Sequence, residues 1–198
     1  MDIRDEVAAL KRTRIIDAAV DLFYTNGYDN TTLEAVGEKL GVTKPFIYSH
    51  FKSKAELLGH ICSRGIAASL DVIDNVMKTE GTPTRKLELI SRGFVAAVLE
   101  NQKYIAIFTR EEKGLSADDL AWINGMRRDF DRKLTLLLEE GRRSGDFQIG
   151  DAHIASLSIG GMVSWAYVWY RDRGRMSIND VASEMTALIL SMVQARHG

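Results

Sequence analysis

The segment from Thr32 to Phe51 constrains the fold of this chain more than any other feature. It predicts two short helices joined by a tight turn, because Gly41 stands between two helical stretches and can supply the left-handed conformation that ends a helix. The hydroxyl of Thr32 can cap the first helix. Residues at i, i+3 and i+7 give that helix one apolar face, formed by Leu33, Val36 and Leu40. A compact helical hairpin is therefore expected near the N-terminus.

The second helix of this pair carries its unusual residues on the outside. Thr43 is expected to cap it, and Pro45 lies in its first turn, where a missing N–H costs nothing. Ile47 and Phe51 are four residues apart and are expected to point into the core. The residues left on the outer side are Lys44, Phe46, Tyr48, Ser49 and His50. A small domain rarely exposes such a set without a use for it.

The charges around the second helix favour an anion as the partner. No acidic residue lies between Thr43 and Lys54, and the segment contains three lysines. Phosphate groups are bound by local positive charge and by free N–H groups at helix N-termini. The pattern predicts the recognition helix of a helix-turn-helix unit. The alternative is an ordinary helical hairpin with a solvated outer face.

A longer run closely resembles the DNA-binding domain of the TetR family of bacterial transcriptional regulators. The residues that carry the resemblance extend from Arg14 to Leu58 and include Asn26-Gly27-Tyr28, Thr31-Thr32-Leu33, Leu40-Gly41-Val42-Thr43-Lys44, Ile47-Tyr48, His50-Phe51 and Lys54. The resemblance implies that Thr32, Tyr48, His50 and Lys54 contact the DNA backbone. It also implies that Thr43, Lys44, Pro45, Phe46 and Ser49 face phosphates or bases. Phe46 and Ser49 depart from the residues common at these positions, so the base preference stays open.

Composition is consistent with a packed soluble protein. The chain has 198 residues, 45% of them hydrophobic, and a formal charge of −1. Residues 1–60 are not basic overall, so DNA contact must come from a local face and from the cluster Lys11-Arg12-x-Arg14, with acidic residues such as Asp17, Asp21 and Glu38 pointing away. The single cysteine, Cys62, excludes an internal disulfide and is read as an apolar filler or, alternatively, a redox sensor. No signal peptide or membrane-spanning segment is visible, so a cytoplasmic location is expected.

Helical periodicity without strand patterns predicts an all-α protein. The resemblance implies a TetR-like homodimer with nine helices in each chain. Residues 1–55 are expected to form the helix-turn-helix DNA-binding domain, and residues 56–198 a ligand-binding and dimerisation domain. The expected helices cover about 4–26, two short helices in 32–51, 54–77, 84–100, 103–110, 117–143, 151–171 and 178–196.

The last two expected helices are apolar on more than one face. A helix that is apolar all round must be buried, and some of this surface is expected to meet a second copy of the chain. Residues 151–171 and 178–196 are therefore the predicted homodimer interface, which would present two recognition helices to a palindromic site. The alternative is that these helices only complete the core of the monomer.

The second half also contains aromatic residues and arginines suited to a ligand cavity. Aromatic packing with surface salt bridges explains the same residues more simply. The run from Gly161 to Arg171, however, resembles the C-terminal domains of TetR-like repressors of fatty-acid, phenylacetate and sterol-ring catabolism, which are typically released from DNA by a CoA thioester. Under this resemblance the candidate ligand-binding residues are Phe108, Trp122, Met126, Arg127, Phe130, Trp165, Trp169 and Arg171.

Together these features and the resemblance predict a one-component repressor that binds double-stranded operator DNA and is released by a small-molecule inducer, with an acyl-CoA as the first candidate. A regulator that responds to multiple drugs or a free hydrophobic ligand is the nearest alternative; an all-α enzyme and a protein-binding adaptor are the others. No metal-ligand spacing, phosphate loop or nucleophile elbow is present, so no catalytic residue, metal or cofactor is assigned.

Overall fold

The computed structural model describes residues 2–193, and within that range it contains helices and no strand, which confirms the all-α prediction. The chain divides into two compact units, the first formed by residues 1–64 and 103–121, the second by residues 65–102 and those from 122 onward. The first unit thus extends past the expected boundary at residue 55 and takes in a later segment. No helix within the described range combines the length and apolar composition needed to cross a bilayer.

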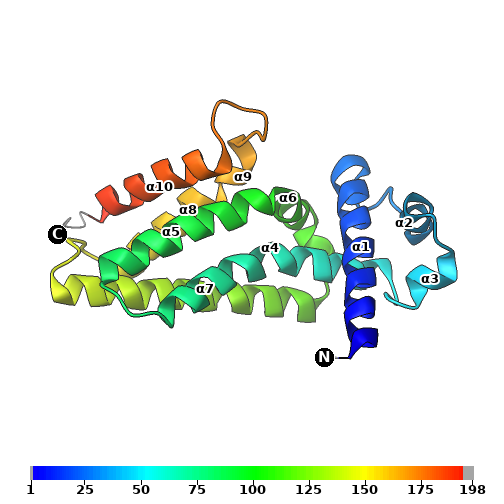
Figure 1. Ribbon diagram of the computed structural model, residues 1–198, viewed down its shortest axis with the longest axis horizontal. Helices are drawn as coiled ribbons and strands as arrows, with labels where there is room; N and C mark the ends of the chain where they lie inside the picture. The colour runs from blue at the N-terminus through cyan, green and yellow to red at the C-terminus, as the bar shows by residue number, and fades with distance from the viewer. Residues whose placement is uncertain (1, 194–198) are drawn as a thin grey trace. The chain divides into compact units, whose positions relative to one another are not determined.

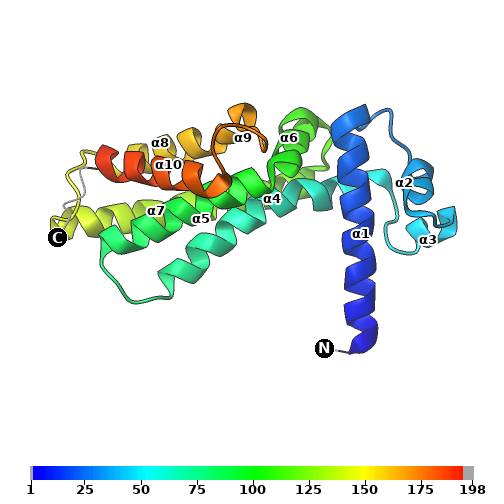
Figure 2. The ribbon, with the colours of Figure 1, turned by 45° about the horizontal axis from the view of Figure 1, so that its top comes forward.

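The first unit contains the two short helices of the hairpin and their neighbours (Figure 1). Helices α1 and α2 pack together, as do α2 and α3, and Figure 2 shows the same neighbours from another side. Its elements are α1 (Ile3–Asn26), α2 (Leu33–Leu40), α3 (Lys44–Tyr48), the first half of α4 (Lys54–Met77), α6 (Gln102–Glu111), the short 3-10 helix η1 (Glu112–Gly114) and the start of α7 (Ala117–Ser144).

Local signals place the ends of these helices. Gly27 ends α1 with φ 86°, and Gly41 ends α2 in the left-handed region with φ 67°. The Thr32 hydroxyl accepts a hydrogen bond from the Ala35 N–H (3.1 Å), as expected for a helix cap. The expectation for Thr43 is wrong in part: the residue precedes α3 in an extended conformation, but its hydroxyl makes no capping hydrogen bond.

Close packing at one glycine fixes the angle between α2 and α3. A Cβ atom on Gly37 would lie 3.1 Å from the Val42 carbonyl oxygen and 3.4 Å from the Ile47 side chain, so a larger residue would require the turn after α2 to shift by a few tenths of an ångström. Ile47 and Phe51 are completely buried, as predicted. Leu40 is only partly buried, because it lies at the end of α2.

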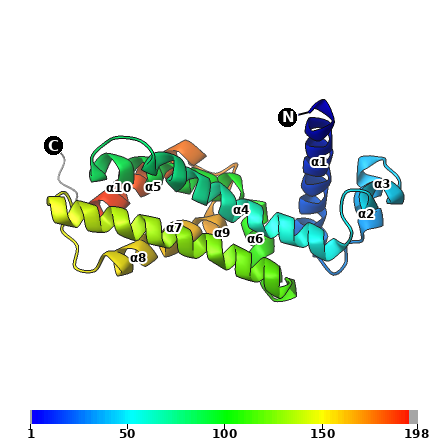
Figure 3. The ribbon, with the colours of Figure 1, turned by 90° about the horizontal axis from the view of Figure 1, so that it is seen from below.

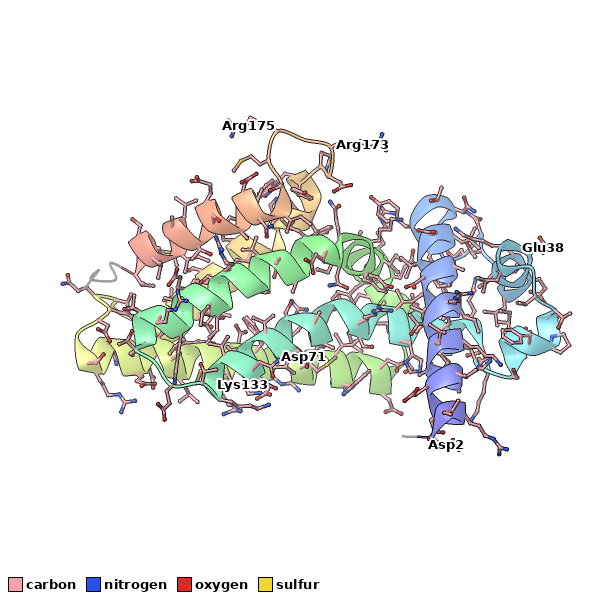
Figure 4. The ribbon with its side chains drawn as sticks, viewed as in Figure 1. Asp2, Glu38, Asp71, Lys133, Arg173 and Arg175 are labelled. Atoms are coloured by element: carbon pink, nitrogen blue, oxygen red, sulfur yellow. The ribbon has the colours of Figure 1, made fainter. Side chains whose placement is uncertain are left out.

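The second unit consists of longer helices. Helix α10 packs along α5, and Figure 3 shows α7 beside α4. Lys133 of α7 forms ion pairs with Asp74 of α4 and with Asp129, and Figure 4 draws its side chain. The elements of this unit are the second half of α4, α5 (Pro83–Glu100), most of α7, α8 (Ala152–Ser164), α9 (Ala166–Trp169) and α10 (Ile178–Met192).

The helix expected over residues 151–171 is divided. Helix α8 ends at Ser164, and the single turn of α9 follows Trp165 and ends at Trp169. Gln102 donates from its side-chain amide to the carbonyl oxygens of Tyr167 (2.6 Å) and Tyr170 (3.1 Å), which satisfies acceptors that a continuing helix would otherwise bond. The last helix begins with a capping box between Ser177 and Asp180, and its expected end near residue 196 lies outside the described residues.

Candidate nucleic-acid interface

The outer face of α3 is formed by residues that share one side of the helix. Phe46 is followed at i+3 by Ser49 and at i+4 by His50, so these three side chains lie together, opposite the buried Ile47 and Phe51. Ser49 is exposed, Phe46 and His50 are partly buried, and Tyr48 beside them is 43% exposed. Four of the residues predicted from the sequence to face DNA therefore lie wholly or partly at the surface.

Phe46 is the large apolar group of this face. Its ring meets the His50 imidazole edge-on, with ring centroids 5.0 Å apart, and the Lys11 ammonium lies 5.7 Å from the ring centre. The Ser49 hydroxyl donates a hydrogen bond of 2.7 Å to the Phe46 carbonyl oxygen. The hydroxyl proton of Ser49 is thus used within the helix.

Lys44 is held by a neighbour on the preceding helix. Its ammonium pairs with the Glu34 carboxylate and lies 5.6 Å from the centre of the Tyr48 ring. The hydrogen bond lowers the pKa of Glu34 and raises the pKa of Lys44. Spacing along the chain could not predict this pairing, since Glu34 and Lys44 belong to different helices.

Arg12 connects α1 to the turn that follows α3. Its guanidinium donates to the His50 carbonyl oxygen and lies 4.3 Å from the centre of the buried Phe51 ring. Burial, followed by the charges of Lys11 and Arg12, lowers the pKa of His50. Arg12 belongs to the basic cluster that the sequence suggested for DNA contact, and in this structure one of its N–H groups holds the His50 carbonyl oxygen.

Lys54 has a different environment from the one expected. Its ammonium donates to the carbonyl oxygens of Tyr28 (2.8 Å), Thr31 (3.0 Å) and Asp29 (3.4 Å), and it lies 4.2 Å from the centre of the Tyr28 ring. An ammonium group has three N–H donors. All three are occupied in this conformation, so a phosphate contact would require Lys54 to give up a carbonyl.

Two acidic residues of α1 bind groups of other helices in the same unit. Asp21 accepts from Lys103 (2.6 Å) and Lys39 (2.9 Å), and Asp17 accepts from the Tyr104 hydroxyl (2.8 Å). These contacts join α1 to α6 and α2. They also occupy the carboxylates that would repel phosphate.

The candidate ligand-binding residues are divided between the two units. Phe108 is buried in the first unit, while the others belong to the second. Phe130 is buried with its ring 4.5 Å from that of Phe94, Met126 is partly buried, and Arg127 is exposed. Trp122 on α7 is 54% exposed.

The aromatic and basic candidates after α8 lie on the surface. Trp165 is 61% exposed and Trp169 49% exposed. Arg171 donates to the carbonyl oxygens of Val168 and Tyr170. Arg173 and Arg175 are exposed in the loop before α10 (Figure 4).

Trp165, the residue directly after α8, continues an apolar stripe of that helix. Ile154, Leu157, Gly161 and Trp165 recur at i, i+3, i+7 and i+11, and all four are exposed. A Cβ atom on Gly161 would meet nothing within 4 Å. Exposed apolar residues of α10, Leu188 and Met192, add to the same kind of surface. We refer to these six residues as the apolar α8–α10 surface.

A helix-turn-helix pair with an exposed recognition helix, joined to a helical second unit, defines the class of DNA-binding transcriptional regulators. Comparison with family models agrees: residues 15–61 match the tetR family of bacterial regulatory proteins, and residues 80–193 match the tetracyclin repressor-like C-terminal domain. The chain belongs to the TetR family of transcriptional regulators.

Relatives of similar length are known. Over 190 residues the chain is 25% identical to the HTH-type transcriptional repressor KstR2 of Rhodococcus jostii, covering 94% of this chain and 93% of KstR2. It is 26% identical to the fatty acid metabolism regulator protein of Bacillus subtilis, covering 91% and 94%. In fold it is similar to AibR, whose crystal structure contains isovaleryl coenzyme A and operator DNA, with a TM-score of 0.77, 23% identity, and 90% and 97% of the chains covered.

Proposed function

We propose that this protein is a homodimeric repressor that binds a palindromic operator through α2 and α3 and is released by a small molecule of the CoA thioester class. The observation that supports DNA binding is the composition of the outer face of α3. This face presents Phe46, Tyr48 and His50 at the surface, with Lys11 of α1 beside them. Thr32 and Thr43 are exposed at the N-termini of α2 and α3, where hydroxyl groups can meet phosphates.

The DNA-binding part is tested with the full chain and a duplex from the region upstream of its own coding sequence. Fluorescence anisotropy should show tighter binding to this duplex than to a scrambled one. Log affinity should fall linearly with log salt, and Lys11→Met should reduce the slope by about one. The matched control is Lys113→Met, which removes the same charge from an exposed residue of η1. Equal affinity for both duplexes would refute operator recognition.

Dimerisation is supported by the apolar α8–α10 surface. Its six residues are exposed in the single chain, and we infer that they come together as one patch of the kind that marks interaction sites. Two-fold pairing would bury the same surface on both copies and would set two recognition helices about one DNA turn apart. The sequence suggested Trp165 as a ligand-binding residue. Here we assign it to the dimer interface instead.

A pair of leucine variants tests the dimer. Leu188→Arg places a charge on the apolar α8–α10 surface, and Leu136→Arg places one on an exposed leucine of α7. Light scattering after size exclusion should give a monomer mass for Leu188→Arg and a dimer mass for Leu136→Arg. A dimer mass for both variants would show that Leu188 does not lie in the dimer interface.

The CoA thioester class rests on the resemblance of residues 161–177 and on relatives that include a fatty acid metabolism regulator. AibR, of the same fold, provides a case in which isovaleryl coenzyme A and operator DNA occur in one crystal structure. The ligand needs only to bind the released conformation better than the DNA-bound one.

A thermal-shift series distinguishes the ligand classes. Acyl-CoAs of increasing chain length, free CoA and the matching free acids are added to the full-length protein. Because a ligand that binds only the folded state raises its stability, acyl-CoAs should raise the unfolding midpoint and the free acids should not. Equal shifts with the free acids would favour a regulator of free hydrophobic ligands.

A further inference from the structure

Phe46 differs from the other outer residues of α3 in what it can offer a base pair. A phenyl ring has no hydrogen-bond donor or acceptor, so it can select a base only through apolar contact. Among the base edges of the DNA major groove, the apolar feature is the 5-methyl group of thymine. A phenylalanine at this position can therefore distinguish thymine from the other bases.

The polar groups around Phe46 are engaged inside the protein. The Ser49 hydroxyl donates to the Phe46 carbonyl oxygen, and the Lys44 ammonium pairs with Glu34. These contacts leave the Ser49 hydroxyl only as an acceptor toward a base and occupy one of the three N–H donors of Lys44. The phenyl ring is the group whose contact with a base does not depend on hydrogen bonding.

The position of the ring is also fixed by its neighbours. The His50 imidazole meets it edge-on at 5.0 Å, and Arg12 holds the His50 backbone through its carbonyl oxygen. On the other helix, the Lys11 ammonium lies 5.7 Å from the ring centre, where it can bind a phosphate beside the base that the ring contacts.

We propose that Phe46 is a specificity-determining residue that reads a thymine in each operator half-site by contact with its 5-methyl group. The inference rests on the proposed operator binding and adds the base that is read. Lys11 and His50 act as positioning residues, because they limit the directions that the ring can take.

The test first needs a duplex that the protein selects. The full-length protein is used to enrich binding sites from a random duplex pool, and each thymine of the selected site is then replaced in turn by deoxyuridine, which lacks only the methyl group. Burial of one methyl group is worth about 0.8 kcal/mol, so at fixed salt the wild-type protein should lose about fourfold in affinity for one substituted half-site and about 15-fold for both. Substitution of thymines outside the half-sites should have no effect.

Variants at Phe46 complete the test. With Phe46→Ser the ratio of affinities for thymine and deoxyuridine should fall to about 1 at that position. Phe46→Leu keeps an apolar side chain and should retain part of the preference. The unfolding midpoint of each variant shows that it is folded.

The outcomes separate the two proposals. A pool that never converges overturns operator binding and this inference together. A pool that converges on a duplex whose affinity is unchanged by every deoxyuridine overturns the inference alone, as does a thymine preference that persists in Phe46→Ser.

Discussion

The ammonium of Lys54 lies over the ring of Tyr28 and donates a 2.8 Å hydrogen bond to the carbonyl oxygen of the same residue. With further bonds to the carbonyl oxygens of Asp29 and Thr31, it ties the start of α4 to the loop before α2. The loop ends at Thr32, whose hydroxyl caps α2. Lys54 therefore stabilises the loop that positions α2 and, with it, the helix-turn-helix pair.

The first prediction concerns this support. Lys54→Met should lower the free energy of unfolding by about 1–3 kcal/mol, because charge-assisted hydrogen bonds to partly buried carbonyls are lost. Urea unfolding of the DNA-free protein measures the effect, with Lys52→Met, an exposed neighbour, as the control. Unchanged stability together with a salt slope reduced by about one would instead assign Lys54 to a phosphate.

A second prediction concerns two glycines of α7. A Cβ atom on Gly141 would lie 2.1 Å from the buried Phe147 ring, whereas one on Gly125 would meet nothing within 4 Å. Gly141→Ala should lower the free energy of unfolding by about 1–3 kcal/mol through overpacking. Gly125→Ala should raise it by up to about 1 kcal/mol, since alanine favours the helix. Thermal unfolding of the two variants should shift in opposite directions; a shared direction would contradict this packing.

The third prediction is the pH dependence of the contact between α1 and α6. Hydrogen bonds from Lys103 and then Lys39 lower the pKa of Asp21. A carboxyl group whose pKa is lowered by folding adds stability above its unfolded pKa of about 3.9, and this stability is lost as the pH falls through the folded value. Because Asp21 is 44% exposed, the effect should be below about 1 kcal/mol. Urea midpoints between pH 6 and pH 2 should fall less steeply for Asp21→Asn than for Asp71→Asn, an exposed control on α4.

The fourth prediction concerns Cys62. The side chain is 1% exposed, and burial raises the pKa of the thiol to about 12. Because the thiolate is the reactive form, Cys62 should react with a disulfide reagent slowly in the native protein and quickly in urea. This favours the apolar-filler interpretation. Native reaction as fast as that of the unfolded chain would support a redox sensor.

The sequence alone determined the local structure of the helix-turn-helix pair. Gly27 and Gly41 end helices, and the Thr32 hydroxyl caps one. Each acts on backbone groups only a few positions away, so its effect can be recognised without knowledge of the rest of the fold. The inward positions of Ile47 and Phe51 follow from helical periodicity in the same way. The family was also recognisable, because its motif is carried by these local residues.

The tertiary structure decided which charged and aromatic side chains remain available. Lys54 finds its carbonyl partners more than twenty positions away, and Lys44 finds Glu34 on another helix. Trp165 and Trp169 are residue types typical of cavities but lie at the surface, Trp165 in line with the exposed residues of α8 and Trp169 at the end of α9. Such outcomes depend on which helices pack together, and spacing along one helix does not contain that information.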